Sequence, residues 1–145
     1  MMMTLGVHSE VGRLREVLIH RPDLSLRRLT PANCHSLLFD DVLWVRKARQ
    51  EHDILADTLN ERGVVVRDLG KLLAETMAVP EGRAWLLDRR LDPDIVGWDL
   101  LDELRSWLDG MEAGSLATAL IGGIARAELP FAPAGLSGLA LATQD

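Results

Sequence analysis

Residues 28–45 read RLTPANCHSLLFDDVLWV and divide into a turn-rich loop followed by an apolar stretch. Residues 23–33 have no clean period, and Thr30-Pro31 and Asn33 are typical turn residues, so an ordered loop is predicted over residues 23–33. Asp40 and Asp41 stand where the apolar pattern begins, and either carboxylate could accept a hydrogen bond from an unpaired backbone N–H at a helix start. We therefore expect Asp40 or Asp41 to be the N-cap of a helix over residues 42–62.

The segments on either side of this stretch predict a strand, a loop, a helix and a second strand. Residues 14–20 alternate at first and then become apolar, which is typical of a strand buried on both faces near its end. Gly63 suits the C′ position of the helix, and residues 64–66 form a β-branched strand after it. Such a crossover favours parallel pairing of the two strands. The apolar stripe of the helix consists of Val45, Ala48, His52, Leu55 and Leu59.

Residues 69–129 have the pattern of five or so short helices in a compact bundle. Pro80 is expected at the first position of the second of these helices, and Gly110 and Gly122-Gly123 at the ends of later ones. From Pro130 the chain is diluted by proline and glycine, and residues 139–141 could begin a strand. The positions expected to face the core are Leu69, Leu72, Leu73, Thr76 or Met77, Ala84, Leu87, Leu91, Leu101, Leu104, Leu108, Leu116, Leu120 and Ile121.

The composition is that of a globular protein, because 48% of the 145 residues are hydrophobic and 26% are charged. The net charge of −6 argues against binding to nucleic acid or to an anionic membrane, since both need a basic face. The Met-rich start lacks the apolar segment of a secretory signal, and residues 113–125 are too few to span a bilayer. A single cysteine cannot form an internal disulfide. We therefore expect a soluble cytoplasmic protein.

The polar side chains give few patterns that are typical of catalysis. Cys34-His35 could contain an activated thiol, but neighbours in sequence usually point apart, so a packed cysteine is favoured. Asp40 and Asp41 could hold a guanidinium, yet the helix-cap interpretation needs no ligand and is favoured. His52 is interpreted as a core histidine with satisfied hydrogen bonds, and no zinc site is expected. The tryptophans are expected to be packing anchors, and they are Trp44, Trp85, Trp98 and Trp107.

Residues 28–45 resemble the N-terminal signature of the arginine deiminases, bacterial enzymes that hydrolyse the guanidinium of free arginine to citrulline and ammonia. Residues 6–12 with Leu14 and Val17 resemble the opening strand region of that family, and residues 103–108 and 120–123 resemble its helical insert. The resemblance implies an α/β class fold, the five-bladed α/β propeller called the pentein fold. Residues 1–68 would form the strand-loop-helix-strand unit of the first blade, residues 69–129 the inserted helical bundle, and residues 130–145 a truncated return to the propeller.

The resemblance also implies a site. The family residue that matches Leu38 contributes to the wall of the substrate pocket, and Phe39 and Asp40 adjoin it. The alternative is that Leu38 is a plain core leucine, and the sequence by itself favours that alternative. The family's nucleophilic cysteine, its acid–base histidine and the two carboxylates that grip the substrate all lie downstream of the matched region. The first of these carboxylates belongs to a Phe-Thr-Arg-Asp stretch that would follow position 145. Cys34 is not the counterpart of the nucleophile, so no catalytic residue is expected in this chain.

These absences lead to the expectation that the chain is a fragment or the product of a truncated gene, inactive by itself. No metal or organic cofactor is implied. The implied partners are L-arginine in the full-length enzyme and either a second copy of the chain or the missing C-terminal part. The alternatives are a catalytically dead interaction or regulatory module and a truncated relic.

Overall fold

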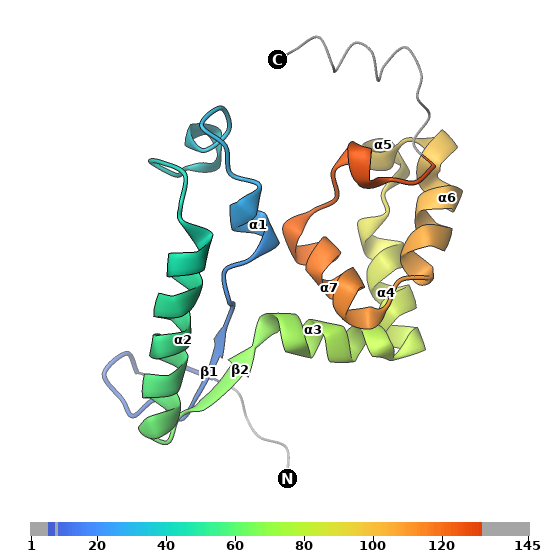
Figure 1. Ribbon diagram of the computed structural model, residues 1–145. Coiled ribbons are helices and arrows are strands. Elements are labelled where there is room, and N and C mark those ends of the chain that lie inside the picture. Colours follow the sequence, from blue (N-terminus) through green and yellow to red (C-terminus); the bar gives the residue numbers. More distant parts are fainter. Residues whose placement is uncertain (1–5, 8, 132–145) are drawn as a thin grey trace.

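The computed structural model describes residues 6–7 and 9–131 and contains a small parallel sheet and a larger group of helices. In Figure 1, α2 stands beside the two strands, α4 to α7 lie together on the other side, and α3 runs between the two groups from the end of β2. The strand predicted over residues 139–141, and residues 132–145 of the predicted return to the propeller, lie outside the described residues. The elements in order are β1 Glu16–Ile19, α1 Leu24–Arg27, the 3-10 helix η1 His35–Leu37, α2 Val45–Glu61, β2 Val65–Asp68, α3 Leu69–Ala78, α4 Pro80–Arg90, α5 Pro93–Val96, α6 Trp98–Asp109, α7 Ala113–Gly122 and the 3-10 helix η2 Arg126–Glu128.

The two strands pair in parallel with α2 as the connection, as the sequence predicts. Glu16 lies opposite Val65, and Ile19 lies opposite Asp68. At the end of α2, Gly63 has a φ of +76° and Val64 N–H donates to the carbonyl of Leu59 at 3.0 Å. This left-handed glycine followed by a bond back across the last turn is a Schellman motif, so the prediction of Gly63 as the C′ residue is confirmed.

The predicted start of α2 is wrong. The helix begins at Val45 with Trp44 as N-cap, and no side chain caps it. Asp41 Oδ1 accepts from Val42 N–H at 2.6 Å, so this carboxylate is used by the next residue and not by the helix. Asp40 is exposed. The helix starts only where side chains become partly buried, at Val45 and Ala48, because tertiary packing stabilises a helix more than its propensity does.

The prediction that β1 is buried on both faces is also wrong. Leu18 is 56% exposed, and the neighbouring Arg67 lies on the surface with its Nε 2.7 Å from Glu16 Oε1. The sheet formed by the described residues has two strands and is packed by α2, so no second layer covers Leu18. Residues 23–33, predicted as a loop, include the short helix α1.

The main core lies among the helices that follow β2. Met77, Leu87, Leu108 and Leu116 are buried together, which confirms four of the predicted core positions. Pro80 opens α4 and Gly123 ends α7 with a φ of +77°, and both outcomes agree with the glycine and proline signals. The side chain of Arg83 joins the ends of two helices, because it donates to the carbonyls of Met77 and Asp109 at 2.8 and 2.6 Å. The five predicted helices are therefore present as α3 to α7.

Several predicted core side chains are exposed instead. Trp44, Trp85 and Trp98 lie largely on the surface, and only Trp107 among the tryptophans packs against the core. Arg46 and Arg89 lie over the rings of Trp44 and Trp85, at 5.4 and 3.9 Å from the centroids, so cation–π contacts replace burial at these two rings. The other exposed positions are Leu55 on α2 and Leu69 and Leu72 on α3.

The helices of the described residues share one further property. None of them is both long enough and apolar enough to cross a bilayer.

Candidate functional site

Residues 28–44, which we call the Leu38 loop, connect α1 to α2 and carry the residues that the sequence singles out. The loop is ordered by Asn33. Its Oδ1 accepts from Thr30 N–H at 2.7 Å, and its Nδ2 donates to the carbonyl of Arg28 at 3.0 Å. The Asn33 carbonyl accepts from Leu37 N–H at 3.2 Å and from the Ser36 hydroxyl at 2.8 Å. This polar residue therefore joins the turn at the start of the loop to η1.

Leu38 itself stands at the end of η1 in an unusual conformation. Its φ is +64°, which makes it the one non-glycine residue with positive φ in the described part of the chain. Phe39 N–H donates back to the carbonyl of Cys34 at 2.9 Å and closes the turn. A left-handed leucine costs about 1–2 kcal/mol relative to a right-handed one. Strain of this size is common at ligand-binding positions, where the surroundings hold it in place.

The side chain of Leu38 is 95% exposed, so the alternative that it is a plain core leucine is wrong. Phe39, by contrast, is half-buried, and Asp40 is exposed. More apolar surface lies further along the same loop, where large side chains point into solvent. These exposed neighbours are Leu37, Val42, Leu43 and Trp44. Apolar side chains that gather on a surface are common at interaction sites.

Two side chains of the Leu38 loop are buried in the fold. Leu29 and Cys34 are both buried, and Cys34 Sγ lies 3.6 Å from the carbonyl of Pro31. His35 is exposed, so the two neighbours point apart and Cys34 is a packed cysteine as interpreted from the sequence. Buried in this way, the thiol has no access to a substrate at the exposed tip of the loop.

Two arginine side chains fix the segment before α1 against α2. Arg49 on α2 donates to the carbonyl of Pro22 at 2.9 Å and also pairs with the carboxylate of Asp23. Arg21 forms a bidentate pair with Asp53, at 2.7 and 2.8 Å. The hydrogen bond from Arg21 lowers the pKa of Asp53 from 3.8 to about 2. The segment before α1 is thereby tied to the middle of α2.

His52 differs from its predicted environment. Its side chain is largely buried, as expected, but both ring nitrogens are buried without a hydrogen-bond partner in the described part of the chain. Nδ1 lies 3.6 Å from Asp53 Oδ1, which is too long for a hydrogen bond. The interpretation of His52 as a satisfied core histidine is therefore wrong.

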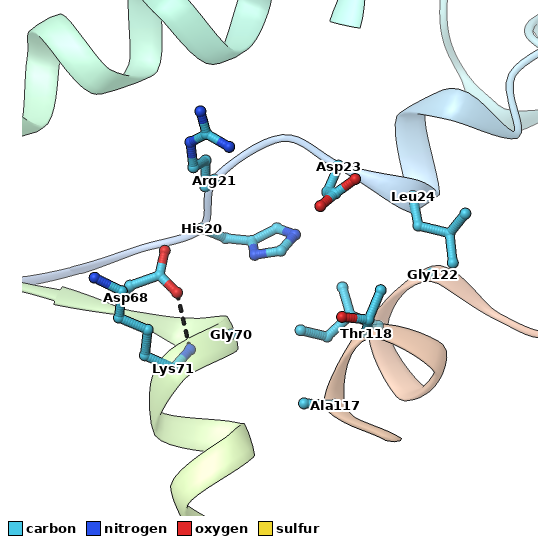
Figure 2. A pocket seen from close by; sticks show the side chains of 11 residues that line it. His20, Arg21, Asp23, Leu24, Asp68, Gly70, Lys71, Ala117, Thr118 and Gly122 are labelled. Atoms are coloured by element: carbon cyan, nitrogen blue, oxygen red, sulfur yellow. Dashed lines mark hydrogen bonds between the residues drawn. The ribbon is translucent and has the colours of Figure 1, made fainter. Parts of the chain in front are cut away.

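We call β1, α1, α2 and β2 the sheet unit, and α3 to α7 the helical part. A separate cavity of about 200 Å³ lies where the sheet unit meets α3 and α7 of the helical part (Figure 2). His20 projects into the cavity from the β1–α1 connection, opposite Thr118 of α7. The residues that the resemblance singles out, Leu38, Phe39 and Asp40, do not line this cavity. Its carboxylates serve the fold, because Asp68 caps α3 through Lys71 N–H at 2.9 Å and Asp23 pairs with Arg49. Among residues 6–7 and 9–131, no group of three or more His, Cys, Asp or Glu side chains is placed to hold a metal ion.

A family model described as arginine deiminase matches residues 35–134, which is more than half of the chain. The chain belongs to the arginine deiminase family. The match begins at His35, inside the Leu38 loop, and continues through α2, the second strand and all five helices after it. The resemblance noted from residues 28–45 is thus confirmed at the level of the family.

Within this arginine deiminase family member, the structure adds residues that the sequence did not single out. Arg28 contacts Glu128, Arg49 contacts Asp23, and Arg21 contacts Asp53. The sequence gives only weak signals for these pairs. Arg21 precedes Pro22 and Arg28 directly follows α1, whereas Arg49 lies within α2, and none of these positions identifies the partner.

Proposed function

We propose that this chain forms one wall of an arginine-binding site and contributes to the hydrolysis of L-arginine to L-citrulline and ammonia. The observation that carries the proposal is Leu38, which is 95% exposed in a strained left-handed conformation at the tip of an ordered loop. An apolar side chain at this position would contact the aliphatic part of arginine and exclude water from the guanidinium. Phe39 and Asp40 adjoin this wall.

We also propose that residues 1–68 are the first blade of a pentein propeller, that residues 69–129 are its helical insert and that residues 130–145 return to the propeller. The parallel pair of β1 and β2 with α2 as the connection supports the blade, and α3 to α7 support the insert. Leu18 and Val65 support it too, because their exposed side chains on a two-stranded sheet suit contact with a further blade.

The chemistry would be shared with groups outside these 145 residues. The family mechanism requires a cysteine thiolate, a histidine and two gripping carboxylates, whereas the one cysteine here is buried under the loop. The role proposed for this chain is therefore binding and water exclusion, with no metal or organic cofactor and no turnover by the chain alone. We place the enzyme in the cytoplasm, where a single reduced cysteine is common.

A fusion enzyme tests the proposal. The chain is joined after Asp145 to the downstream two-thirds of an arginine deiminase, and citrulline is measured by a colorimetric assay. The unfused chain and its Cys34→Ser variant should make no citrulline. The fusion should be active. Leu38→Ala should lower kcat/KM, and the decrease should correspond to a loss of roughly 1–3 kcal/mol of transition-state stabilisation. Leu72→Ala, the same truncation at an exposed position on α3, is the matched control and should have little effect. An active fusion in which both changes are equally harmless would exclude Leu38 from the site.

A second candidate is an interaction module that binds a full-length relative. The exposed Trp98, which is 75% accessible, and the exposed Leu18 favour it, because large apolar side chains on a surface are common at protein contacts. An inactive fusion, together with co-elution of the 145-residue chain and an intact arginine deiminase in size-exclusion chromatography, would favour this second function over the first.

A further inference from the structure

We propose that Arg28 is a positioning residue through which the turn after α7 holds the Leu38 loop in its substrate-facing conformation. This inference rests on the proposed function of the loop as the wall of an arginine site. It gives the helical part of the chain a role in substrate binding in addition to packing.

Toward the helices, the guanidinium of Arg28 is fixed by two acceptors. Nη2 donates to the carbonyl of Gly123 at 3.0 Å and to Glu128 Oε2 at 2.7 Å. Glu128 Oε2 also accepts from Ala125 N–H at 2.7 Å, so the carboxylate is itself held in place. Gly123 follows α7 with a φ of +77°, and its carbonyl is thereby available to a side chain from another part of the fold. Charge-assisted hydrogen bonds of this kind are stronger than neutral ones.

Toward Leu38, the backbone of Arg28 continues the same network. Its carbonyl accepts from Asn33 Nδ2 at 3.0 Å, and the Asn33 carbonyl accepts from Leu37 N–H at 3.2 Å. A continuous path therefore runs from Glu128 through Arg28 and Asn33 to the residue before Leu38. Hydrogen-bond networks are one of the structures that carry energetic coupling between separated sites, and the coupling along this path is what the experiments below measure.

The conformation of Leu38 explains why such a hold is needed. A left-handed leucine with its side chain in solvent gains almost nothing from burial, so the surrounding contacts must keep it there. Arg28 keeps its position although its Nε is buried without a hydrogen-bond partner in the described residues. An unsatisfied donor is unfavourable, which indicates that the two bonds of Nη2 outweigh it.

Hydrogen exchange on the full 145-residue chain tests this inference without arginine. In Arg28→Met, which keeps the apolar stem and removes the donors, the amides of Leu37, Leu38 and Phe39 should exchange roughly tenfold faster than in the wild type. Exchange near Met77 and Leu116 should not change. Arg28→Lys should restore part of the protection.

Arg105→Met is the matched control, because Arg105 pairs with Asp88 and Asp109 inside the helical part and does not contact the loop. Should Arg28→Met fold poorly, Glu128→Ala removes one of the two acceptors and should shift the same amides in the same direction.

Kinetics of the fusion enzyme separate positioning from simple stabilisation. Arg28→Met should raise KM for arginine more than it lowers kcat, and the effects of Arg28→Met and Leu38→Ala should be less than additive, since both act through the same side chain. Unchanged exchange of the loop amides in Arg28→Met, or fully additive kinetic effects, would overturn the inference. If Leu38→Ala alone is harmless in an active fusion, the proposed function fails. The exchange result then decides by itself whether Arg28 holds the loop.

Discussion

Gly122 of α7 lies directly against Leu24 of α1. A Cβ built on Gly122 would come within 2.6 Å of Leu24 Cβ, a distance that real side chains do not reach. Gly122 is buried, and α1 and α7 face each other across the seam between the sheet unit and the helices in Figure 1. Because α1 leads into the Leu38 loop, this close approach sets where the loop begins relative to the helices.

Gly122→Ala should therefore destabilise the protein. The new methyl group meets the branch point of Leu24, not a flexible end, so α1 has to move, and overpacking of this kind costs about 1–3 kcal/mol. Urea denaturation followed by circular dichroism measures the loss. Gly110→Ala is the control, since the nearest atom to its added Cβ is at 3.5 Å and its φ of −79° suits alanine. Equal midpoints for the two variants would mean that α1 adapts without cost.

His52→Leu should stabilise the protein by about 1 kcal/mol at neutral pH. Both ring nitrogens of His52 are buried without a hydrogen-bond partner in the described part of the chain, so their removal eliminates an unfavourable desolvation. Leucine is also the better helix former at this position within α2. The midpoint of urea unfolding at about pH 7.5 gives the change. His35→Leu, at an exposed position, should leave the midpoint almost unchanged. A clear loss of stability in His52→Leu would show that the imidazole makes a polar contact that matters.

The ends of several elements could be predicted from the sequence because their chemistry is local. Gly63 is needed where φ is positive, and Pro80 fits the first turn of a helix because its missing N–H would be unpaired there anyway. The start of α2 could not be predicted in this way. Asp41 had an equally local alternative, the N–H of the next residue, and nothing in the sequence distinguishes the two uses of one carboxylate.

The candidate site was predicted only as far as a family resemblance reaches. The resemblance points to Leu38, but periodicity alone would place a leucine in the core, and its left-handed conformation has no sequence signal comparable to a glycine. The contact of Arg28 with Glu128 joins residues 100 positions apart. Such a pair depends on how α1 and α7 meet, and that meeting is decided by tertiary packing and not by either local sequence.

The stability of the protein should fall in acid, and Asp53 should be one cause. The hydrogen bond from Arg21 lowers the pKa of Asp53 to about 2 in the folded state, below its ordinary value of 3.8. A group whose pKa is lowered on folding stabilises the fold above its ordinary pKa, and this contribution is lost as the pH falls from about 4 to about 2. Backbone N–H groups of Gly114 and Ser115 lower the pKa of Glu112 and add an effect of the same sign.

Asp53→Asn tests this pH dependence. The variant should be less stable than the wild type at neutral pH, and the two curves of unfolding midpoint against pH should converge toward pH 2. Asp57→Asn changes an exposed carboxylate on the same helix and should run parallel to the wild type throughout. A constant difference between Asp53→Asn and the wild type across the whole range would show that the Arg21 pair does not depend on the charge of Asp53.

The sheet unit should open more readily than the helical part. The buried cluster of Met77, Leu87, Leu108 and Leu116 lies wholly between helices. Among the residues that the structure describes, the one buried side chain that borders β2 is Val64. Both strands have an open edge in the described structure, and a two-stranded sheet is only marginally stable by itself. Amides over residues 16–19 and 65–68 should therefore exchange through openings of lower free energy than amides over residues 101–108. Native-state hydrogen exchange with mass spectrometry gives both values in one experiment.

Addition of the downstream two-thirds of an arginine deiminase in the fusion should slow exchange in the strands selectively, because a neighbouring blade would cover the open edge and Leu18. Strands that already exchange more slowly than α6 in the 145-residue chain would mean that the sheet is complete without further blades, and the propeller assignment would be wrong.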